Sequence, residues 1–243
     1  MGRIGGRALA ALACGALAFT LASCGSSPPV NNSPAVVNLV KDVRSAVADK
    51  GSVHIVIHRR QTGKKEVELL SGDIGSTSAD EHIVQGGAIV SIRVTPKASY
   101  FSGNASGLTT FLGLSKKDAA RAGDRWVENK VGSTQYKDLY QADTMSSLPN
   151  SLLPNTSSDA VTLASSSSAG AKVKTLTWKS SDDGSTVAQT LVVPATGSPL
   201  PLTETTKVSS IDQTSTFTAW GEHLNVVAPP AADVVSYSSV TSG

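Results

Sequence analysis

The sequence has 243 residues, of which 40% are hydrophobic and 16% are charged. This length and composition are typical of a globular protein, with either one large β-rich domain or two smaller ones. The formal net charge of +2 excludes the strongly basic surface with which proteins usually bind nucleic acids.

The N-terminal residues have the three parts of a secretory signal. Arg3 and Arg7 form the basic front, residues 8–22 are mostly apolar, and small residues precede Cys24. The run Leu21-Ala-Ser-Cys24 resembles the lipobox of bacterial lipoproteins, which implies diacylglycerol on the Cys24 sulfur and cleavage before this residue. The alternatives are an ordinary signal peptide or a short membrane anchor, but the apolar run is short for a span of ~20 residues.

Cleavage before Cys24 changes two properties of the chain. Cys14 leaves with the signal, so the mature protein cannot form an intramolecular disulfide and must be stabilised by its core. The 21 Lys and Arg residues lose Arg3 and Arg7, and the remaining 19 match 19 Asp and Glu. This balance predicts no binding to nucleic acid or anionic lipid. Since no second apolar stretch reaches spanning length, we expect a soluble body attached to the membrane through its lipid anchor.

The first predicted element after the tether of residues 24–33 is a helix. Ser33-Pro34 has a capping residue followed by proline, and Gly51 marks the end. Its apolar residues fall on one face: Val36, Leu39, Val40, Val43 and Val47. We therefore expect an amphipathic helix of about four turns that packs on a sheet.

Two sets of short β-branched segments separated by turn residues predict an antiparallel meander. The first set is 52–60, 67–70, 82–85, 88–94 and 97–103. The second set is 173–179, 186–193, 199–208 and 214–219, with Asp183-Gly184 as a hairpin turn, and is followed by a last strand at 224–227.

A helical insert at about 104–155 separates the two sets. It contains predicted helices at 108–112, 115–121 and 135–148, with a brief strand at 124–129. The serine-rich residues 165–168 that follow carry no prediction of a strand.

Several segments, in this order, resemble the mycobacterial and actinobacterial LppX/LprG-type lipoproteins and, more distantly, the LolA-type lipoprotein carriers. After the lipobox and first helix they are Ser52-Val-His-Ile, Leu70-Ser-Gly-Asp-Ile74, Tyr100-Phe101, Arg125-Trp126-Val127, Pro199-Leu-Pro-Leu202 and residues 220–230. The resemblance implies an α+β fold: a strongly curved antiparallel half-barrel, with helices covering its mouth and an apolar cavity between them. Such proteins carry or present acylated lipids in the cell envelope.

The expected organisation is a signal peptide at 1–23, a tether at 24–33, one LolA-like domain at 34–230 and a tail at 231–243. Within this fold, the candidates for lining a lipid cavity are apolar strand residues. They are Ile55, Ile57, Leu69, Val90, Ile92, Val94, Tyr100, Trp126, Trp178, Leu191 and Phe217. The alternative for each of them is ordinary core packing.

The sequence predicts no catalytic, metal or cofactor site. His54 and His58 would lie ~13 Å apart on one strand, which is too far to share a metal ion, and His82 and His223 have no local partner. A Gly-x-Ser-x-Gly nucleophile elbow and phosphate-binding glycine motifs are absent from the sequence. We therefore expect a non-enzymatic protein at the extracytoplasmic face of the cell membrane, which binds a lipid, a glycolipid or another long apolar molecule. The alternative is an interaction protein of the same fold, with a filled core, that docks to a membrane or a protein partner.

Overall fold

The computed structural model describes residues 32–62, 67–168, 170–182 and 185–242. The predicted signal peptide, Cys24 and nearly all of the tether lie outside these residues, as does the Asp183-Gly184 turn.

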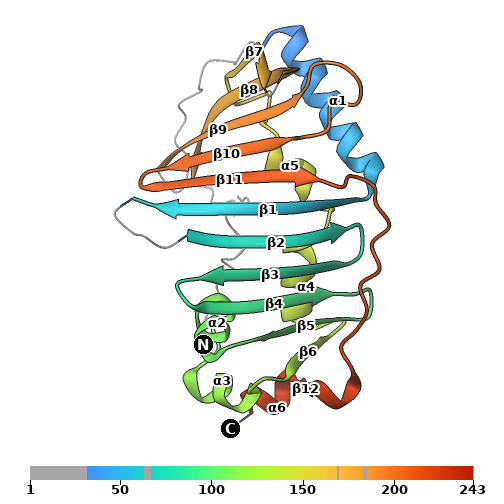
Figure 1. Ribbon diagram of the computed structural model, residues 1–243, viewed down its shortest axis with the longest axis vertical. Coiled ribbons are helices and arrows are strands. Elements are labelled where there is room, and N and C mark those ends of the chain that lie inside the picture. Colours follow the sequence, from blue (N-terminus) through green and yellow to red (C-terminus); the bar gives the residue numbers. More distant parts are fainter. Residues whose placement is uncertain (1–31, 63–66, 169, 183–184, 243) are drawn as a thin grey trace, which may run out of the picture.

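All twelve strands belong to one sheet, with the order β12-β6-β5-β4-β3-β2-β1-β11-β10-β9-β8-β7 (Figure 1). Their bounds are β1 Ser52–Gln61, β2 Val67–Gly75, β3 Ala79–Gln85, β4 Ala88–Val94, β5 Ala98–Gly103, β6 Trp126–Lys130, β7 Val161–Ser168, β8 Ala171–Asp182, β9 Ser185–Pro194, β10 Thr203–Val208, β11 Ile211–Thr218 and β12 Val234–Ser236. Strands β1–β6 and β7–β11 form two antiparallel meanders, and the β1–β11 pair joins them. Among the strands that the structure describes, β12 alone pairs in parallel, with β6.

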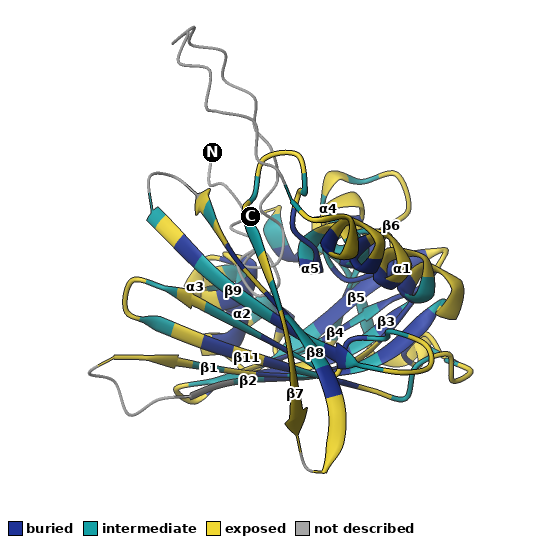
Figure 2. Ribbon diagram, turned by 90° about the horizontal axis from the view of Figure 1, so that it is seen from above, coloured by how far each residue is buried: buried dark blue, intermediate teal, exposed yellow. Residues whose placement is uncertain are grey.

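The sheet is strongly curved and unclosed, and helices lie on its concave side. Figure 2 shows that the sheet is curved and that α1, α4 and α5 lie on one side of it. This arrangement confirms the predicted α+β half-barrel with covering helices.

Helix α1 (Pro34–Lys50) confirms the prediction made from the N-terminal segment. The Oγ atom of Ser33 accepts a hydrogen bond from the backbone N–H of Val36, and Gly51 ends the helix with φ at 70°. This left-handed conformation is one that glycine adopts without strain. The five residues of the predicted apolar face are buried, so α1 packs through that face.

The insert contains α2 (Ala105–Leu112), α3 (Lys116–Ala122), α4 (Thr134–Ala142) and α5 (Leu148–Leu152). The single helix predicted at 135–148 is wrong, because the chain leaves the helical path after Ala142. There the backbone N–H of Met145 donates to the carbonyl oxygen of Gly75, at 3.0 Å. This bond to the end of β2 uses the N–H that a continuing helix would donate to the carbonyl oxygen of Gln141.

Two further differences concern strands. Residues 161–168 form β7, which pairs along its whole length with β8 although half of it is serine. As an edge strand it needs no continuous apolar face. The strand predicted at 224–227 is absent, since this segment passes along the ends of the strands (Figure 1).

The C-terminal residues, expected as a tail outside the domain, take part in the fold. Strand β12 extends the sheet beyond β6, and α6 (Tyr237–Thr241) buries Val240. The ring of Tyr237 also meets Phe101 edge-on, with ring centroids 6.4 Å apart.

Candidate functional site

The pairing of the strands decides which residues line the concave face. Directly opposite residues of an antiparallel pair share a face of the sheet. One such row crosses seven strands: Phe217, Ile55, Gly72, Glu81, Ile92, Phe101 and Val127. Every residue of this row is buried. The next row runs through Leu176, Leu191, Glu204, Ser215, Ile57, Leu70, Ile83 and Val90, and it is buried as well.

Eight of the eleven predicted lining residues lie on this concave face. They are Ile55, Ile57, Val90, Ile92, Val94, Trp178, Leu191 and Phe217. The structure therefore brings together side chains from both meanders, which are far apart in the sequence.

Leu69, Tyr100 and Trp126 do not line the concave face. They lie on the convex face, because the side chains of a strand alternate and each of these residues is next to a concave one. Their neighbours Leu70, Phe101 and Val127 are the buried concave residues.

The two convex aromatic residues have polar partners instead. The hydroxyl of Tyr100 donates to Oε1 of Glu128 at 3.5 Å, and burial together with this carboxylate raises the pKa of Tyr100. The guanidinium of Arg93 lies 4.8 Å from the centroid of the Trp126 ring. Nε of Arg93 also donates to Asp80 at 3.1 Å. These contacts form a polar cluster on the convex side.

The walls of the concave site are aliphatic and closely packed. Val43 and Val47 of α1 are 0% exposed, as are Ile55, Val90 and Leu191 of the sheet. Leu148 and Leu152 of α5 are buried too. Burial of a side chain of this size stabilises the fold by roughly 1.5–3 kcal/mol, so these contacts contribute both to the site and to stability.

Acidic residues interrupt this apolar surface at its centre. Glu81 projects from β3 onto the concave face and is 1% exposed, while Asp143, which follows α4, is 2% exposed. Burial raises the pKa of Glu81 well above its ordinary value, and the nearby Asp143 carboxylate raises it further. Burial also raises the pKa of Asp143, to about 8.

Gly72 on β2 makes room for Glu81. A Cβ atom at this position would lie 2.7 Å from Cγ of Glu81, closer than two carbon atoms can approach without displacement. The absent side chain of Gly72 therefore provides the space into which the Glu81 side chain folds.

A third buried acid, Glu204, lies on the concave face of the second meander. Its Oε1 accepts hydrogen bonds from Nε2 of Gln189 and from Oγ1 of Thr206, each at 3.5 Å. Burial raises the pKa of Glu204 to about 7, although these hydrogen bonds oppose the shift.

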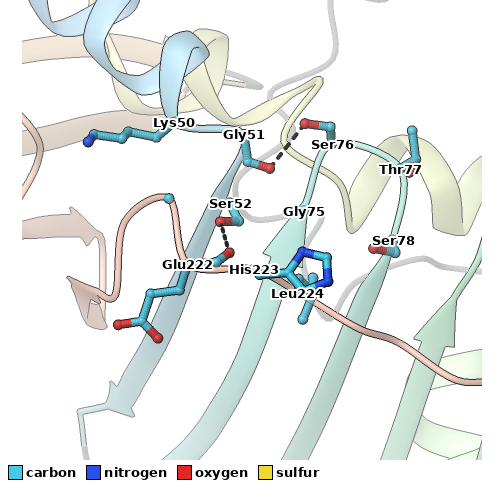
Figure 3. A pocket seen from close by; sticks show the side chains of 11 residues that line it. Lys50, Gly51, Ser52, Gly75, Ser76, Thr77, Ser78, Glu222, His223 and Leu224 are labelled. Atoms are coloured by element: carbon cyan, nitrogen blue, oxygen red, sulfur yellow. Dashed lines mark hydrogen bonds between the residues drawn. The ribbon is translucent and has the colours of Figure 1, made fainter.

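A separate polar pocket of about 360 Å³, which we call the edge pocket, opens at the ends of the central strands β1 and β2, between the end of α1, the β2–β3 turn and residues 221–224. Figure 3 shows its hydrogen bonds: Oγ of Ser76 donates to the carbonyl oxygen of Gly51, at 3.0 Å, and Oγ of Ser52 donates to that of Glu222, at 2.6 Å. The side chains of Lys50 and Glu222 extend away from the turn in this view. These two serine hydroxyls bind carbonyl oxygens of other segments, so the pocket lies where three segments of the chain are joined by hydrogen bonds.

The histidines lie outside the concave site. His54, His58 and His82 are on the convex face, and His223 lines the edge pocket. Nδ1 of His54 lies 2.8 Å from the carboxylate of Asp73. Among the described residues, no group of three His, Cys, Asp or Glu side chains could hold a metal ion. The described helices also include none that is long and apolar enough to span a membrane.

Comparison with known proteins identifies the fold. No protein-family model and no curated protein sequence matches the chain. Among the solved structures that are similar to it is the lipoprotein LppX of Mycobacterium tuberculosis, with a TM-score of 0.52 and 15% identity over 81% of this chain and 100% of LppX. Another is LprF of Mycobacterium bovis, with a TM-score of 0.55 and 13% identity over 81% of this chain and 98% of LprF. The chain has the LolA-like fold of these two proteins. The expected resemblance is thereby confirmed at the level of the fold.

Sequence reasoning did not single out the three buried acids of this LolA-like structure. One signal was available for Glu81, which stands between Ala79 and Ile83 in a strand where alternate residues are apolar. An acid at such a position is placed on the buried face by its spacing alone. Asp143 has no comparable signal, because its burial depends on where the chain leaves α4.

Proposed function

We propose that the protein is a lipid-anchored protein of the cell envelope that binds a lipid, a glycolipid or another long apolar molecule between its concave sheet and its helices. One observation carries this proposal: eight predicted lining residues from both meanders share one apolar face. The buried aliphatic residues of α1 and α5 belong to the same core cluster as that face, and both helices lie on its side of the sheet (Figure 2). An acyl chain is bound by such walls through apolar contact rather than through directional bonds.

The anchor proposed is diacylglycerol on Cys24, with the body at the extracytoplasmic face of the membrane. Its support is the lipobox-like sequence at residues 21–24, and it agrees with the description of LppX, which shares the fold, as a lipoprotein. A single acyl chain gives marginal membrane binding, whereas two chains anchor a protein stably.

We propose binding without catalysis. The concave face presents aliphatic and aromatic side chains, the Glu81–Asp143 pair and, apart from it, Glu204, and the four histidines lie elsewhere. A nucleophile, a base and an orienting group that converge on one point are the minimum for acyl transfer. The polar groups described above are instead spread over separate strands.

A second candidate function is supported by how closely the concave residues pack. Ile55, Val90 and Leu191 are 0% exposed and Ile92 is 2% exposed, as in a filled core. In this alternative the protein is an interaction module that docks to a membrane or a protein partner through its outer surface. The two candidates differ in whether the concave face accepts a ligand.

The experiment that separates them combines lipid analysis with one substitution. An organic extract of the purified non-acylated body, which lacks Cys24, is examined by mass spectrometry, with the native sequence at position 92 and with Ile92→Trp, and the thermal midpoint is measured for both. Trp at position 92 adds volume to the concave face. Ser91→Trp is the matched control, since Ser91 lies on the same strand with its side chain on the convex face.

The carrier proposal predicts a co-purifying lipid that is lost in Ile92→Trp, with a midpoint close to that of Ser91→Trp. A filled core predicts no lipid in any variant and a large loss of stability in Ile92→Trp, because overpacking typically costs about 1–3 kcal/mol. That second result would overturn the carrier proposal.

A further inference from the structure

The segment from α4 to α5, residues 134–152, packs on the concave side of the sheet through buried residues that include Met145, Leu148 and Leu152, and we call it the strap. Three hydrogen bonds also attach it to the ends of the strands. The hydroxyl of Tyr136 donates to the carbonyl oxygen of Thr95 at 3.2 Å, and that of Tyr140 to the carbonyl oxygen of Ser76 at 3.5 Å. The Met145 N–H bond to Gly75 is the third contact. The strap is thus bound to the ends of β2 and β4 rather than woven into the sheet.

The acid pair of Glu81 and Asp143 lies where the strap meets the sheet, with one carboxyl group from each side. Among the described residues, both carboxyl oxygens of Glu81 lack a hydrogen-bond partner, and so does Oδ2 of Asp143. A buried ionised carboxylate without a partner is strongly unfavourable. Two of them close together cannot both ionise at little cost, so the pair keeps at least one proton over a wide pH range.

No described charge compensates this pair. The residue that faces Glu81 on β2 is Gly72, and on β4 it is Ile92. The buried side of α1 is aliphatic. Asp80, the chain neighbour of Glu81, lies on the convex face with Arg93, and the charged residues of α4, Lys137 and Asp138, are exposed. A second negative charge at the pair would therefore stand without a counter-ion.

We propose that Glu81 and Asp143 form a proton-operated latch that holds the strap on the concave face. While protonation keeps the pair from carrying two charges, both side chains can stay buried without a hydrogen bond between them, and the strap stays on the sheet. When both groups ionise, their repulsion and their need for water favour separation of the strap from the sheet. The latch opens the cover of the concave face as the pH rises, and it does so whether or not that face binds a lipid.

The test is amide hydrogen exchange, expressed as protection factors so that the intrinsic pH dependence of exchange is removed. Peptides of the strap and of β1–β4 are compared at about pH 6 and about pH 9, on either side of the pKa of about 8 of Asp143. The variants are the double substitution Glu81→Gln with Asp143→Asn and, as matched control, Glu204→Gln. Glu204 is a buried acid on the same face but on β10, outside the strap.

The latch predicts that protection of the strap in the wild type falls at least roughly tenfold at the higher pH, relative to β1–β4. The same fall is expected in Glu204→Gln, whereas the double variant loses the pH dependence. An equal change in strap and sheet, or a fall that persists in the double variant, would overturn the proposal.

If the double variant does not fold, the wild type still decides the matter. The carboxyl carbons of Glu81 and Asp143 are followed by NMR during a pH titration, and single substitutions assign them. Midpoints above about pH 6 for at least one carboxyl, accompanied by shifts of strap amides in the same range, support the latch. Midpoints near the ordinary carboxyl value of about 4 for both groups would overturn it.

Discussion

Because Gly72 has no side chain, it leaves the space that the side chain of Glu81 occupies. In Gly72→Ala the new methyl group would lie 2.7 Å from Cγ of Glu81 and 3.1 Å from the carbonyl oxygen of Asp80. We expect this substitution to lower the free energy of unfolding by roughly 1–3 kcal/mol, the usual effect of overpacking. Urea denaturation of the purified protein measures it.

The control is the same substitution in a Glu81→Ala background. With the glutamate shortened, the nearest side-chain atom is gone and the cost of Gly72→Ala should shrink. The assignment of Gly72 to this role fails if the alanine is equally costly in both backgrounds.

Glu204 gives the stability of the protein an unusual dependence on pH. Because its pKa rises from 4.5 in the unfolded chain to about 7 in the folded protein, the folded state retains a proton that the unfolded chain releases between these values. The stabilisation that Glu204 contributes is therefore complete below about pH 4.5, decreases as the pH rises to 7, and is lost above it. The contribution is on the order of 3 kcal/mol.

The measurement is the free energy of unfolding at about pH 5 and about pH 8. Glu204→Gln should reduce the difference between the two pH values, while Glu222→Gln, at an exposed position, should leave it unchanged. Glu81 and Asp143 act in the same direction, so part of the difference remains. A wild type that is more stable at the higher pH would contradict the raised pKa values.

At the scale of elements, Asn32 fastens the start of α1 to the start of β7. Its Nδ2 donates to the carbonyl oxygens of Thr156 and Asp159, at 2.9 and 2.8 Å, and its Oδ1 accepts from the N–H of Val161, at 2.9 Å. The Asn32 side chain thus accepts the hydrogen bond from the N–H of Val161, the first residue of an edge strand, in place of a backbone carbonyl oxygen.

Asn32→Ala should release this strand end. We expect exchange of the Val161 amide to accelerate by at least roughly tenfold, since one such hydrogen bond contributes about 1 kcal/mol and three are lost. Asn38→Ala, an exposed residue of α1, is the control and should leave that amide unchanged. If the amide exchanges equally slowly in Asn32→Ala, the side chain is not what holds β7 in place.

The elements differ in how far the sequence could predict them. Helix α1 was predictable in full, because its cap, its apolar stripe and its terminal glycine agree. The end of α4 was not, since a hydrogen bond to Gly75, distant in sequence, terminates it. Strand β7 was not predictable for a similar reason. Its serines adopt a strand conformation because they pair with β8, not because serine favours strands.

At the scale of the molecule, the lipid anchor is the prediction with the largest effect on where the protein is found. Cys24→Ala removes the sulfur that would carry diacylglycerol. We expect the variant to appear outside the membrane fraction or as an unprocessed precursor. Cell fractionation and the mass of the mature N-terminus measure this, and Cys14→Ala, the other cysteine of the chain, should behave like the wild type. A Cys24→Ala protein that is processed and retained in the membrane would refute the lipobox interpretation.

The fold of the whole molecule was predictable, but the faces of its sheet were only partly so. Strand spacing and the order of short motifs indicated a curved half-barrel with helical cover. A shift of one residue, however, exchanges concave and convex positions, which is why Tyr100 and Trp126 were placed in the cavity instead of Phe101 and Val127. The buried acids depend on contacts between distant segments, which a pattern of apolar residues cannot reveal.

The position of β1 in the middle of the sheet has a consequence for the order in which the protein is assembled. As the chain emerges from its N-terminal end, β1–β6 can pair one after another with close neighbours in sequence. The other side of β1 must wait for β11, because residues 62–210 lie between the paired residues Gln61 and Ile211. During this interval β1 exposes an unpaired row of N–H and C=O groups, which is a template for association with another chain. A newly synthesised molecule is therefore most vulnerable to aggregation until one of its last strands pairs beside its first.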